Sequence, residues 1–299
     1  MWRGHHDAVP VGIIDVGSNT VRLDVSRGGK SVYRERVMLR LGESIERHGL
    51  LPAEKLDEAT STVQRFVRDA RLHGAEPVEV LVTSPGRQAS NGEQLVGRLA
   101  AATGAQVRLL SAEEEGRLAF IGTLAATRRG HHGLIAVCDV GGGSLQVTVG
   151  TRQDGVAWVR SLDMGSMRLT SRLLDGDPPG DVAVGRARDE MDRLLDGFAP
   201  PLPETALAVG GSARALRVIV GSTLAPDELD EATRILACTP ANEIASIYDV
   251  HLERVRTLAA GAVILSALQE RLCIPLRVVR GAGVREGAAI ELASRRAAA

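Results

Sequence analysis

The chain of 299 residues has few cysteines and no long apolar run. Its three cysteines, Cys138, Cys238 and Cys273, lack the spacing of a metal site or a redox pair, which fits a reducing compartment. No apolar stretch approaches the length of a membrane span, and the first residues contain no apolar signal core. We therefore expect a cytoplasmic protein that has no membrane partner. Cys138 falls within a predicted buried strand and is interpreted as a small apolar core residue.

A strong imbalance of charge is also absent. The formal net charge is −1, which argues against a general nucleic-acid-binding protein. Only Lys30 and Lys55 are lysines, so 34 of the 36 basic residues are arginines. Arginine makes better bidentate contacts with phosphate than lysine does. The sequence has neither a Walker lysine nor a G-x-S-x-G elbow, so neither a P-loop nor an α/β-hydrolase site is indicated.

One short pattern occurs twice in the sequence. An apolar run ends in an aspartate and a glycine-containing turn, first as Ile13–Thr20 (IIDVGSNT) and again as Ala136–Ser144 (AVCDVGGGS). A strand that ends this way places bare backbone N–H groups beside a carboxylate. The N–H groups can bind phosphate oxygens, and the carboxylate can hold a hydrated divalent cation that bridges to them. A third strand that ends in glycines before a helix is predicted at Ala208–Ser212.

Predicted strands and helices alternate, which is typical of an α/β protein. In the first half we expect strands at about 9–16, 20–27, 31–41, 78–83 and 106–110, and helices at about 52–73, 91–102 and 111–128. The second half restarts with strands near 133–140, 144–150 and 156–162, then becomes mostly helical, with short strands near 205–209 and 275–280. The polar stretch 128–133 separates two predicted domains, 1–129 and 130–299.

Three consecutive glutamates lie at the start of the predicted helix 111–128. Ser111 and Glu114 form a capping box, in which each side chain accepts a hydrogen bond from the other residue's backbone N–H. Acidic residues are favoured in a first helical turn, so on local grounds Glu113, Glu114 and Glu115 need no further function. The residues alone leave that interpretation open.

The three glycine turns together resemble those of the acetate kinase, hexokinase, heat-shock protein and actin superfamily. Its members hold phosphates between two ribonuclease-H-like domains. The flanking residues are similar to the exopolyphosphatase/guanosine pentaphosphate phosphohydrolase (Ppx/GppA) family, in its short two-domain form. Segments that resemble its signatures run through the chain in the family's order: Asp15–Leu23, Thr83–Asn91, Ser111–Leu118, Asp139–Ser144, Met164–Thr170 and Gly283–Gly287. The resemblance implies two actin-like α/β domains with a phosphate-binding cleft between them.

The same resemblance implies roles for individual residues. Glu115 would be the catalytic base that activates water, and Asp15 and Asp139 would hold Mg²⁺, or alternatively Mn²⁺, largely through waters. Arginines that could bind the anion are Arg22, Arg40, Arg87 and Arg117. The phosphate-binding turns would comprise Gly17, Ser18, Asn19 and Thr20, then Gly141, Gly142, Gly143 and Ser144, and finally Gly210 and Gly211. A homodimer is implied by the family resemblance alone.

Two positions depart from the family pattern. Gln146 stands where the family usually has Glu, and an amide cannot supply the negative charge that attracts a metal ion. Pro85 and Gly86 replace the residues that usually precede Arg87, which reshapes the loop expected there.

The resulting hypothesis is an exopolyphosphatase that releases orthophosphate from the end of inorganic polyphosphate with the help of a metal ion. One alternative is removal of the 5′ γ-phosphate of guanosine pentaphosphate (pppGpp). Another is a non-catalytic sensor that binds (p)ppGpp or polyphosphate, in which Gln146 in place of the usual Glu would indicate that hydrolytic activity has been lost.

Overall fold

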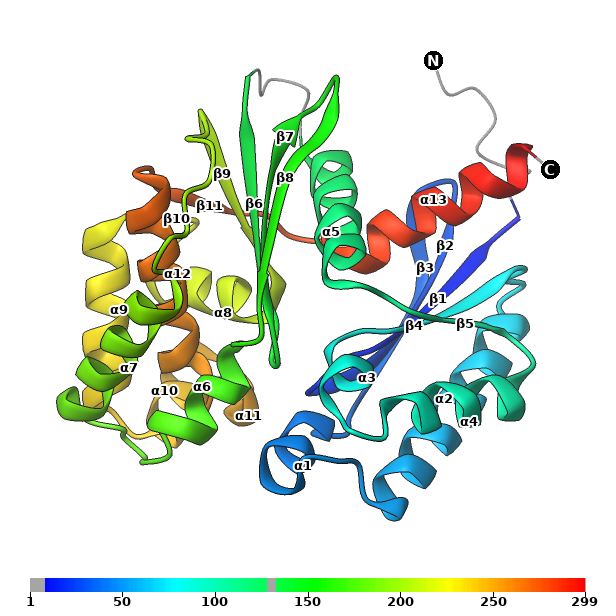
Figure 1. The fold of residues 1–299 in the computed structure, drawn as a ribbon, viewed down its shortest axis with the longest axis horizontal. Helices are drawn as coiled ribbons and strands as arrows, with labels where there is room; N and C mark the ends of the chain where they lie inside the picture. Colours follow the sequence, from blue (N-terminus) through cyan, green and yellow to red (C-terminus); the bar gives the residue numbers. More distant parts are fainter. Residues whose placement is uncertain (1–8, 128–132, 299) are drawn as a thin grey trace. The chain divides into compact units, whose positions relative to one another are not determined.

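The computed structural model describes residues 9–127 and 133–298, and the chain folds into two compact units (Figure 1). The first unit comprises Met1–Leu118 together with Val284–Ala299, and the second comprises Ala119–Gly283. The predicted boundary between residues 129 and 130 lies outside the described residues. The observed division has its first boundary between Leu118 and Ala119. It also assigns the last helix, α13 (Val284–Ala298), to the first unit, because this helix packs against the first strand of that unit.

The first unit is built on a five-stranded sheet of order β3-β2-β1-β4-β5. Its strands are β1 (Val11–Val16), β2 (Thr20–Arg27), β3 (Lys30–Met38), β4 (Val78–Val82) and β5 (Gln106–Leu109). The first three strands are antiparallel neighbours, whereas β4 runs parallel to β1 and β5 parallel to β4. The carboxyl ends of β1 and β4 therefore meet at one edge of the sheet.

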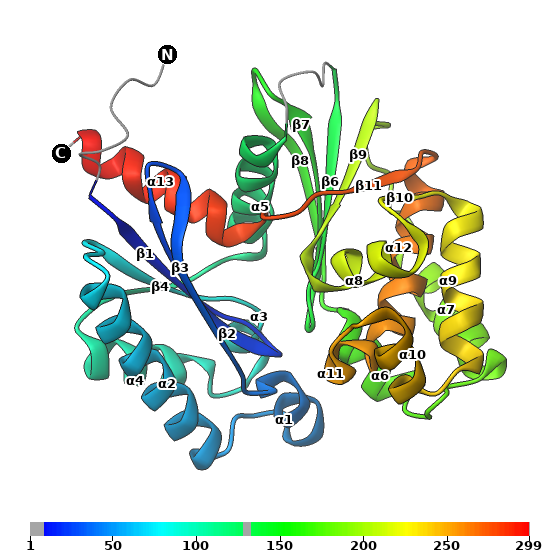
Figure 2. The same ribbon diagram turned by 180° about the vertical axis from the view of Figure 1, so that it is seen from behind.

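Helices cover the two faces of this sheet differently. The helices are α1 (Leu41–His48), α2 (Ala53–Leu72), α3 (Ser84–Gln88), α4 (Gly92–Thr103), the first half of α5 (Ala112–Ala126), and α13. An apolar core that includes Ile14, Leu23, Phe66 and Leu95 joins one face to α2 and α4. Both ribbon views show α13 running beside β1 on the other face (Figures 1 and 2).

Two elements of the first unit differ from the sequence prediction. The third strand ends at Met38 rather than near residue 41, because Arg40 adopts a left-handed backbone conformation (φ 53°) and begins α1. The loop expected around Pro85 is the short helix α3, in which Pro85 occupies the first turn, a position where a missing N–H costs no hydrogen bond.

The second unit repeats the arrangement in a six-stranded sheet of order β10-β11-β9-β6-β7-β8. Its strands are β6 (Ile135–Val140), β7 (Leu145–Thr151), β8 (Gly155–Leu162), β9 (Thr205–Val209), β10 (Thr223–Leu224) and β11 (Leu276–Val278). Strands β8-β7-β6-β9-β11 follow one another in the order and directions of β3-β2-β1-β4-β5. This duplicated topology confirms the prediction of two ribonuclease-H-like domains.

The part of the second unit that follows β8 is mostly helical, as predicted. The helices that lie wholly within it are α6 (Ser166–Leu173), α7 (Asp181–Leu194), α8 (Gly210–Val220), α9 (Pro226–Cys238), α10 (Ala241–Tyr248), α11 (Leu252–Val255) and α12 (Leu258–Leu272). Helix α12 is buried along nearly its whole length in the main apolar core. Cys138 lies buried in β6, and burial raises the pKa of its thiol to about 12, consistent with the predicted core role. No helix among the described residues is long and apolar enough to cross a membrane.

Candidate functional site

The two repeated turns have the same backbone geometry. Val16 pairs with Val21 across the first turn, and Val140 pairs with Leu145 across the second. The Gly17 N–H donates to the Thr20 carbonyl at 3.2 Å, and the Gly141 N–H donates to the Ser144 carbonyl at 3.0 Å. These two N–H groups were predicted to bind phosphate, but each instead closes its own turn. The repeat in the sequence is therefore a repeat in structure.

A helix start holds the first turn in place. The Ser18 carbonyl accepts from the Gly42 N–H (2.8 Å), and the Asn19 carbonyl accepts from the N–H groups of Leu39 and Arg40 (both 3.1 Å). The C=O and N–H of a trans peptide point in opposite directions. The N–H groups of Asn19 and Thr20 therefore point away from α1, as an anion-binding turn requires.

The second turn is held in the same way by α6. The Gly141 and Gly142 carbonyls accept from the Ser166 N–H (2.9 Å) and the Met167 N–H (3.0 Å). By the same peptide geometry, the N–H groups of Gly142 and Gly143 point away from α6. A Cβ atom on Gly165 would lie 2.4 Å from the carbonyl carbon of Gly142. Only glycine permits this approach, which gives the segment Met164–Thr170 its structural role.

The third turn lies against the second aspartate. Gly210 follows β9 with a φ of 95°, and a Cβ atom on it would lie 2.9 Å from Asp139 Oδ1 and 2.7 Å from the Val140 carbonyl. The Arg254 guanidinium of α11 packs on Gly211, with Cζ 2.7 Å from where its Cβ atom would be. Sequence reasoning did not identify Arg254, because its short helix carries no motif that links it to the glycine turn.

In the first unit, contacts connect the phosphate turn to Glu115. The Ser18 hydroxyl lies 2.6 Å from the Ser84 hydroxyl at the start of α3. From the same helix, Arg87 donates to Glu115 Oε2 at 2.7 Å and to the Leu110 carbonyl at 2.9 Å. Both members of the ion pair are largely buried, with 18% and 12% of their side chains exposed. The predicted base and the predicted Arg87 are therefore brought together.

The capping box that begins α5 is present as predicted. Ser111 N–H donates to Glu114 at 2.9 Å, and Glu114 N–H donates to the Ser111 hydroxyl at 3.1 Å. Hydrogen bonding to the backbone N–H of Ser111 and to Arg108 outweighs burial and lowers the pKa of Glu114. Glu114 therefore faces the helix start, whereas its neighbour Glu115 faces Arg87.

The other predicted arginines are placed differently. Arg22 lies directly opposite Asp15 in the β1–β2 register, so their side chains leave the same face of the sheet. Arg117 instead forms an ion pair with Glu291 of α13, which directs it toward that helix. Arg40 serves as the residue that begins α1.

Gln146 occupies the position directly opposite Asp139 in the β6–β7 register. Its side chain is 2% exposed, and its amide nitrogen donates to the hydroxyls of Ser144 (3.0 Å) and Ser161 (3.2 Å). The amide therefore holds the last residue of the second turn. The charge of the glutamate usual in the family is missing, but the position retains a hydrogen-bonding role.

Taken separately, each of the two aspartates offers carboxylate oxygens of the kind that a hydrated magnesium ion accepts. Asp15 Oδ1 lies 3.9 Å from where a Cβ atom on Gly17 would be, and Asp139 Oδ1 faces Gly210. Within the described residues, no three His, Cys, Asp or Glu side chains come together as a metal cage. Mg²⁺ in phosphate sites typically takes one or two carboxylates and completes its shell with waters and phosphate oxygens. The residues present match that donor set.

Asp15 has a partner that the sequence did not indicate. Arg285, near the start of α13, donates to Asp15 Oδ2 at 3.3 Å. The segment Gly283–Gly287 had been matched to a family signature, but its contact was not foreseen. The two residues are 270 positions apart, so no local pattern could reveal the pair.

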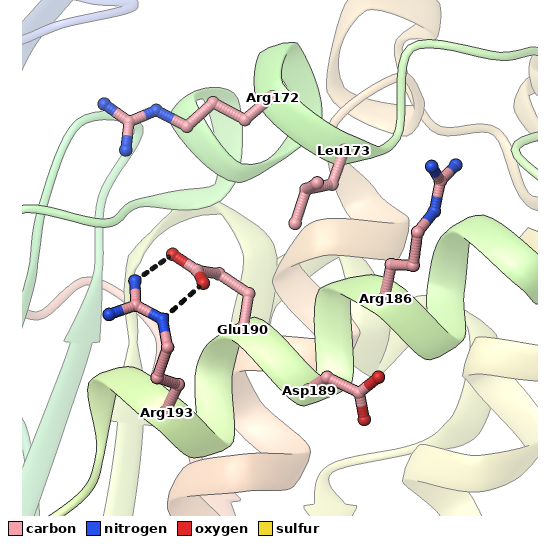
Figure 3. A pocket seen from close by; sticks show the side chains of 6 residues that line it. All are labelled: Arg172, Leu173, Arg186, Asp189, Glu190 and Arg193. Atoms are coloured by element: carbon pink, nitrogen blue, oxygen red, sulfur yellow. Dashed lines mark hydrogen bonds and ion pairs between the residues drawn. The ribbon is translucent and has the colours of Figure 1, made fainter.

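A separate cavity of about 410 Å³ lies between α6 and α7 (Figure 3). Its lining comprises Arg172, Leu173, Arg186, Asp189, Glu190 and Arg193. Both oxygens of Glu190 are taken by Arg193, at 2.9 and 2.7 Å. The lining carries three arginines and two carboxylates, and none of the predicted site residues belongs to it.

Comparison with known proteins identifies relatives along nearly the whole chain. The model of the Ppx/GppA phosphatase family matches residues 23–296. Exopolyphosphatase 1 of Mycobacterium tuberculosis is 30% identical over 301 residues, which cover 93% of this chain and 86% of the relative. Exopolyphosphatase 2 of the same organism is 26% identical over 318 residues, covering 95% and 98%.

A solved structure agrees with the fold. The Aquifex aeolicus member of the Ppx/GppA family superposes with a TM-score of 0.79 and 25% identity, covering 97% of this chain and 98% of that one. The similarity therefore includes both units.

Proposed function

The chain belongs to the Ppx/GppA phosphatase family, and from that premise we propose that it hydrolyses the terminal phosphoanhydride bond of inorganic polyphosphate and releases orthophosphate. Two relatives over most of its length are named exopolyphosphatases, which supports this substrate. The observation that carries the proposal is the connected set of contacts from the Ser18 turn through Ser84 and Arg87 to Glu115.

In this proposal each group of the first unit has one task. The outward-pointing N–H groups of Asn19 and Thr20 bind phosphate oxygens. The Glu115 carboxylate orients a water molecule for in-line attack and accepts its proton. Arg87 holds Glu115 in place and adds positive charge where negative charge develops.

In the second unit, the N–H groups of Gly142 and Gly143 bind phosphate oxygens. Asp15 and Asp139 are the residues that would hold Mg²⁺, which when bound neutralises phosphate charge. Mn²⁺ has the same preference for hard oxygen ligands and is an alternative ion.

The test is phosphate release from long-chain polyphosphate, short-chain polyphosphate and pppGpp, each with and without Mg²⁺. Glu115→Gln should lower kcat by at least about 100-fold, since general-base catalysis contributes on the order of 10²–10⁴. Glu113→Gln is the matched control, because Glu113 is exposed in the same helical turn, and it should retain wild-type rates. Equal rates for the two variants would refute the role of Glu115.

A non-catalytic sensor is the second candidate, and Gln146 is the observation that favours it. With an amide opposite Asp139, the second unit has one fewer carboxylate near the turn than the family usually has. A sensor would bind polyphosphate or (p)ppGpp without releasing phosphate from any of the three substrates. Release from pppGpp alone would identify the pentaphosphate phosphohydrolase instead.

A further inference from the structure

Arg285 is a nearly buried cation beside the aspartate assigned to the metal. Its guanidinium lies 3.3 Å from Asp15 Oδ2, and the exposed fractions of the two side chains are 14% and 16%. Little water can therefore screen the pair, so the interaction between these charges is stronger than at a surface.

An alternating series of charges fixes Arg285 in this position. Beyond Asp15, the guanidinium lies 4.0 Å from Glu286, Glu286 lies 3.5 Å from Arg34, and Arg34 pairs with Asp24 at 2.6 Å. A guanidinium stays protonated in proteins, so Arg285 keeps its positive charge beside Asp15.

This fixed charge changes how a divalent cation can reach Asp15. One carboxylate charge attracts the cation while the neighbouring guanidinium repels it, and the two effects oppose each other at similar range. A phosphate group bound at the adjacent turn adds negative charge and oxygen ligands, which Mg²⁺ prefers to combine with one or two carboxylates.

We propose that Arg285 makes cation binding at Asp15 depend on phosphate, so that the metal ion enters as a metal–phosphate complex. The inference rests on the proposed function, because it takes Asp15 as a metal-holding residue. Arg285 acts here through Asp15 and is a positioning residue. A simple anchor for α13 would use the same contact but would have no effect on the affinity for a cation.

The experiment measures Mn²⁺ binding by the loss of the free-ion electron paramagnetic resonance signal, with and without inorganic phosphate. Wild type should bind Mn²⁺ at least about 10-fold more tightly with saturating phosphate, a typical coupling between two sites. Arg285→Gln should bind Mn²⁺ about 10-fold more tightly than wild type without phosphate and should lose most of the phosphate dependence. Unchanged or weaker phosphate-free affinity in this variant would overturn the proposal.

Two further variants separate charge from structure. Arg34→Gln removes the more exposed arginine of the same series (52% of its side chain exposed) and should keep the wild-type affinity within about twofold. Arg285→Lys retains the positive charge and should keep the phosphate dependence. If Arg285→Lys instead gained phosphate-free affinity as Arg285→Gln does, the charge would not be the cause, and the proposal would fail. The comparison of Arg285→Lys with wild type can be made even if Arg285→Gln folds poorly.

A fourth variant distinguishes failure of this inference from failure of the metal assignment. Asp15→Asn should lose Mn²⁺ affinity in the presence of phosphate. If Asp15→Asn binds Mn²⁺ as wild type does, the assignment of Asp15 fails, and the inference fails with it. If Asp15→Asn loses affinity and Arg285→Gln behaves as wild type, only the role of Arg285 is overturned.

Discussion

Gln146, in the strand that follows the second turn, has two roles in this fold. Gln146 of β7 lies directly opposite Asp139 of the adjacent strand β6, and its amide also donates to Ser144 at the end of the turn. A glutamate there could not donate these hydrogen bonds while ionised. The amide therefore lacks the negative charge of a glutamate but holds the end of the turn through its hydrogen bonds.

At this scale we predict that Gln146→Glu destabilises the second unit in the absence of a metal ion. The introduced carboxylate would face Asp139 and leave the hydroxyls of Ser144 and Ser161 without their donor, at a cost of about 1–3 kcal/mol. Mg²⁺ should recover part of this loss, so the Mg²⁺-dependent increase in Tm should exceed that of wild type. Differential scanning calorimetry with and without Mg²⁺ measures both effects.

Gln269→Glu provides the control, because Gln269 is also buried (6% exposed) but lies in α12. Its Tm should fall without a matching response to Mg²⁺. An equal Mg²⁺ response in the two variants would show that the effect is not specific to the position opposite Asp139.

At the scale of elements, both phosphate turns depend on the start of a neighbouring helix. In each unit the carbonyls of the turn accept from N–H groups at that helix start, which are otherwise without a partner inside the helix. This arrangement turns the opposite N–H groups outward. The helix that follows β8 therefore determines the geometry of a turn made some 20 residues earlier.

We predict that Gly165→Ala disturbs the second turn. The added Cβ atom would lie 2.4–2.7 Å from backbone atoms of Gly141 and Gly142, and forcing extra atoms into a packed site costs about 1–3 kcal/mol. Urea unfolding followed by the fluorescence of Trp158 in β8 reports on this unit. Phosphate release should fall as well.

Gly185→Ala is the matched control, since a Cβ atom on this glycine of α7 meets nothing within 4 Å. It should be stabilised by about 0.5–1 kcal/mol, because alanine is preferred to glycine inside a helix. A loss of stability equal to that of Gly165→Ala would contradict the steric argument.

The sequence predicts elements where the deciding contacts are local. The capping box of Ser111 and Glu114 joins residues three apart, and the Asp15 and Asp139 hairpins are closed within four residues, so all were predicted from the sequence. Helix α1 was missed, because the left-handed conformation of Arg40 has no characteristic residue type. The partner of Asp15 was missed because it lies 270 positions later in the sequence.

At the scale of the whole molecule, a network of ion pairs joins α13 to the first sheet. Glu79 of β4 is 1% exposed and is matched by Arg108 (3.3 Å) and Arg295 (3.2 Å). Glu291 of α13 contacts Arg108 and Arg117 as well. The network joins β4, β5, α5 and the last helix, so the first unit is complete only when α13 is in place.

We predict that Arg108→Met weakens this unit by about 3 kcal/mol, because it leaves the buried Glu79 carboxylate with one arginine. Hydrogen–deuterium exchange of β1 and β4, measured by mass spectrometry, should rise accordingly. Arg98→Met removes the more exposed pair with Asp57 (side chains 37% and 71% exposed) and should cost less than about 1 kcal/mol. Similar exchange in both variants would argue against a special role for the buried network.

Because α13 belongs to the first unit, the ribosome cannot complete that unit until it has synthesised the second. The nascent chain exposes the strands that carry Asp15 and Glu79 early, but their arginine partners Arg285 and Arg295 emerge only after the whole second unit has been synthesised. Domains usually fold as they are synthesised, the N-terminal one first. Here the whole second unit is synthesised before α13 completes the first. A polypeptide that ends before α13 would leave the carboxylates of Asp15 and Glu79 without these arginines, and its incompletely folded first unit would be open to proteases.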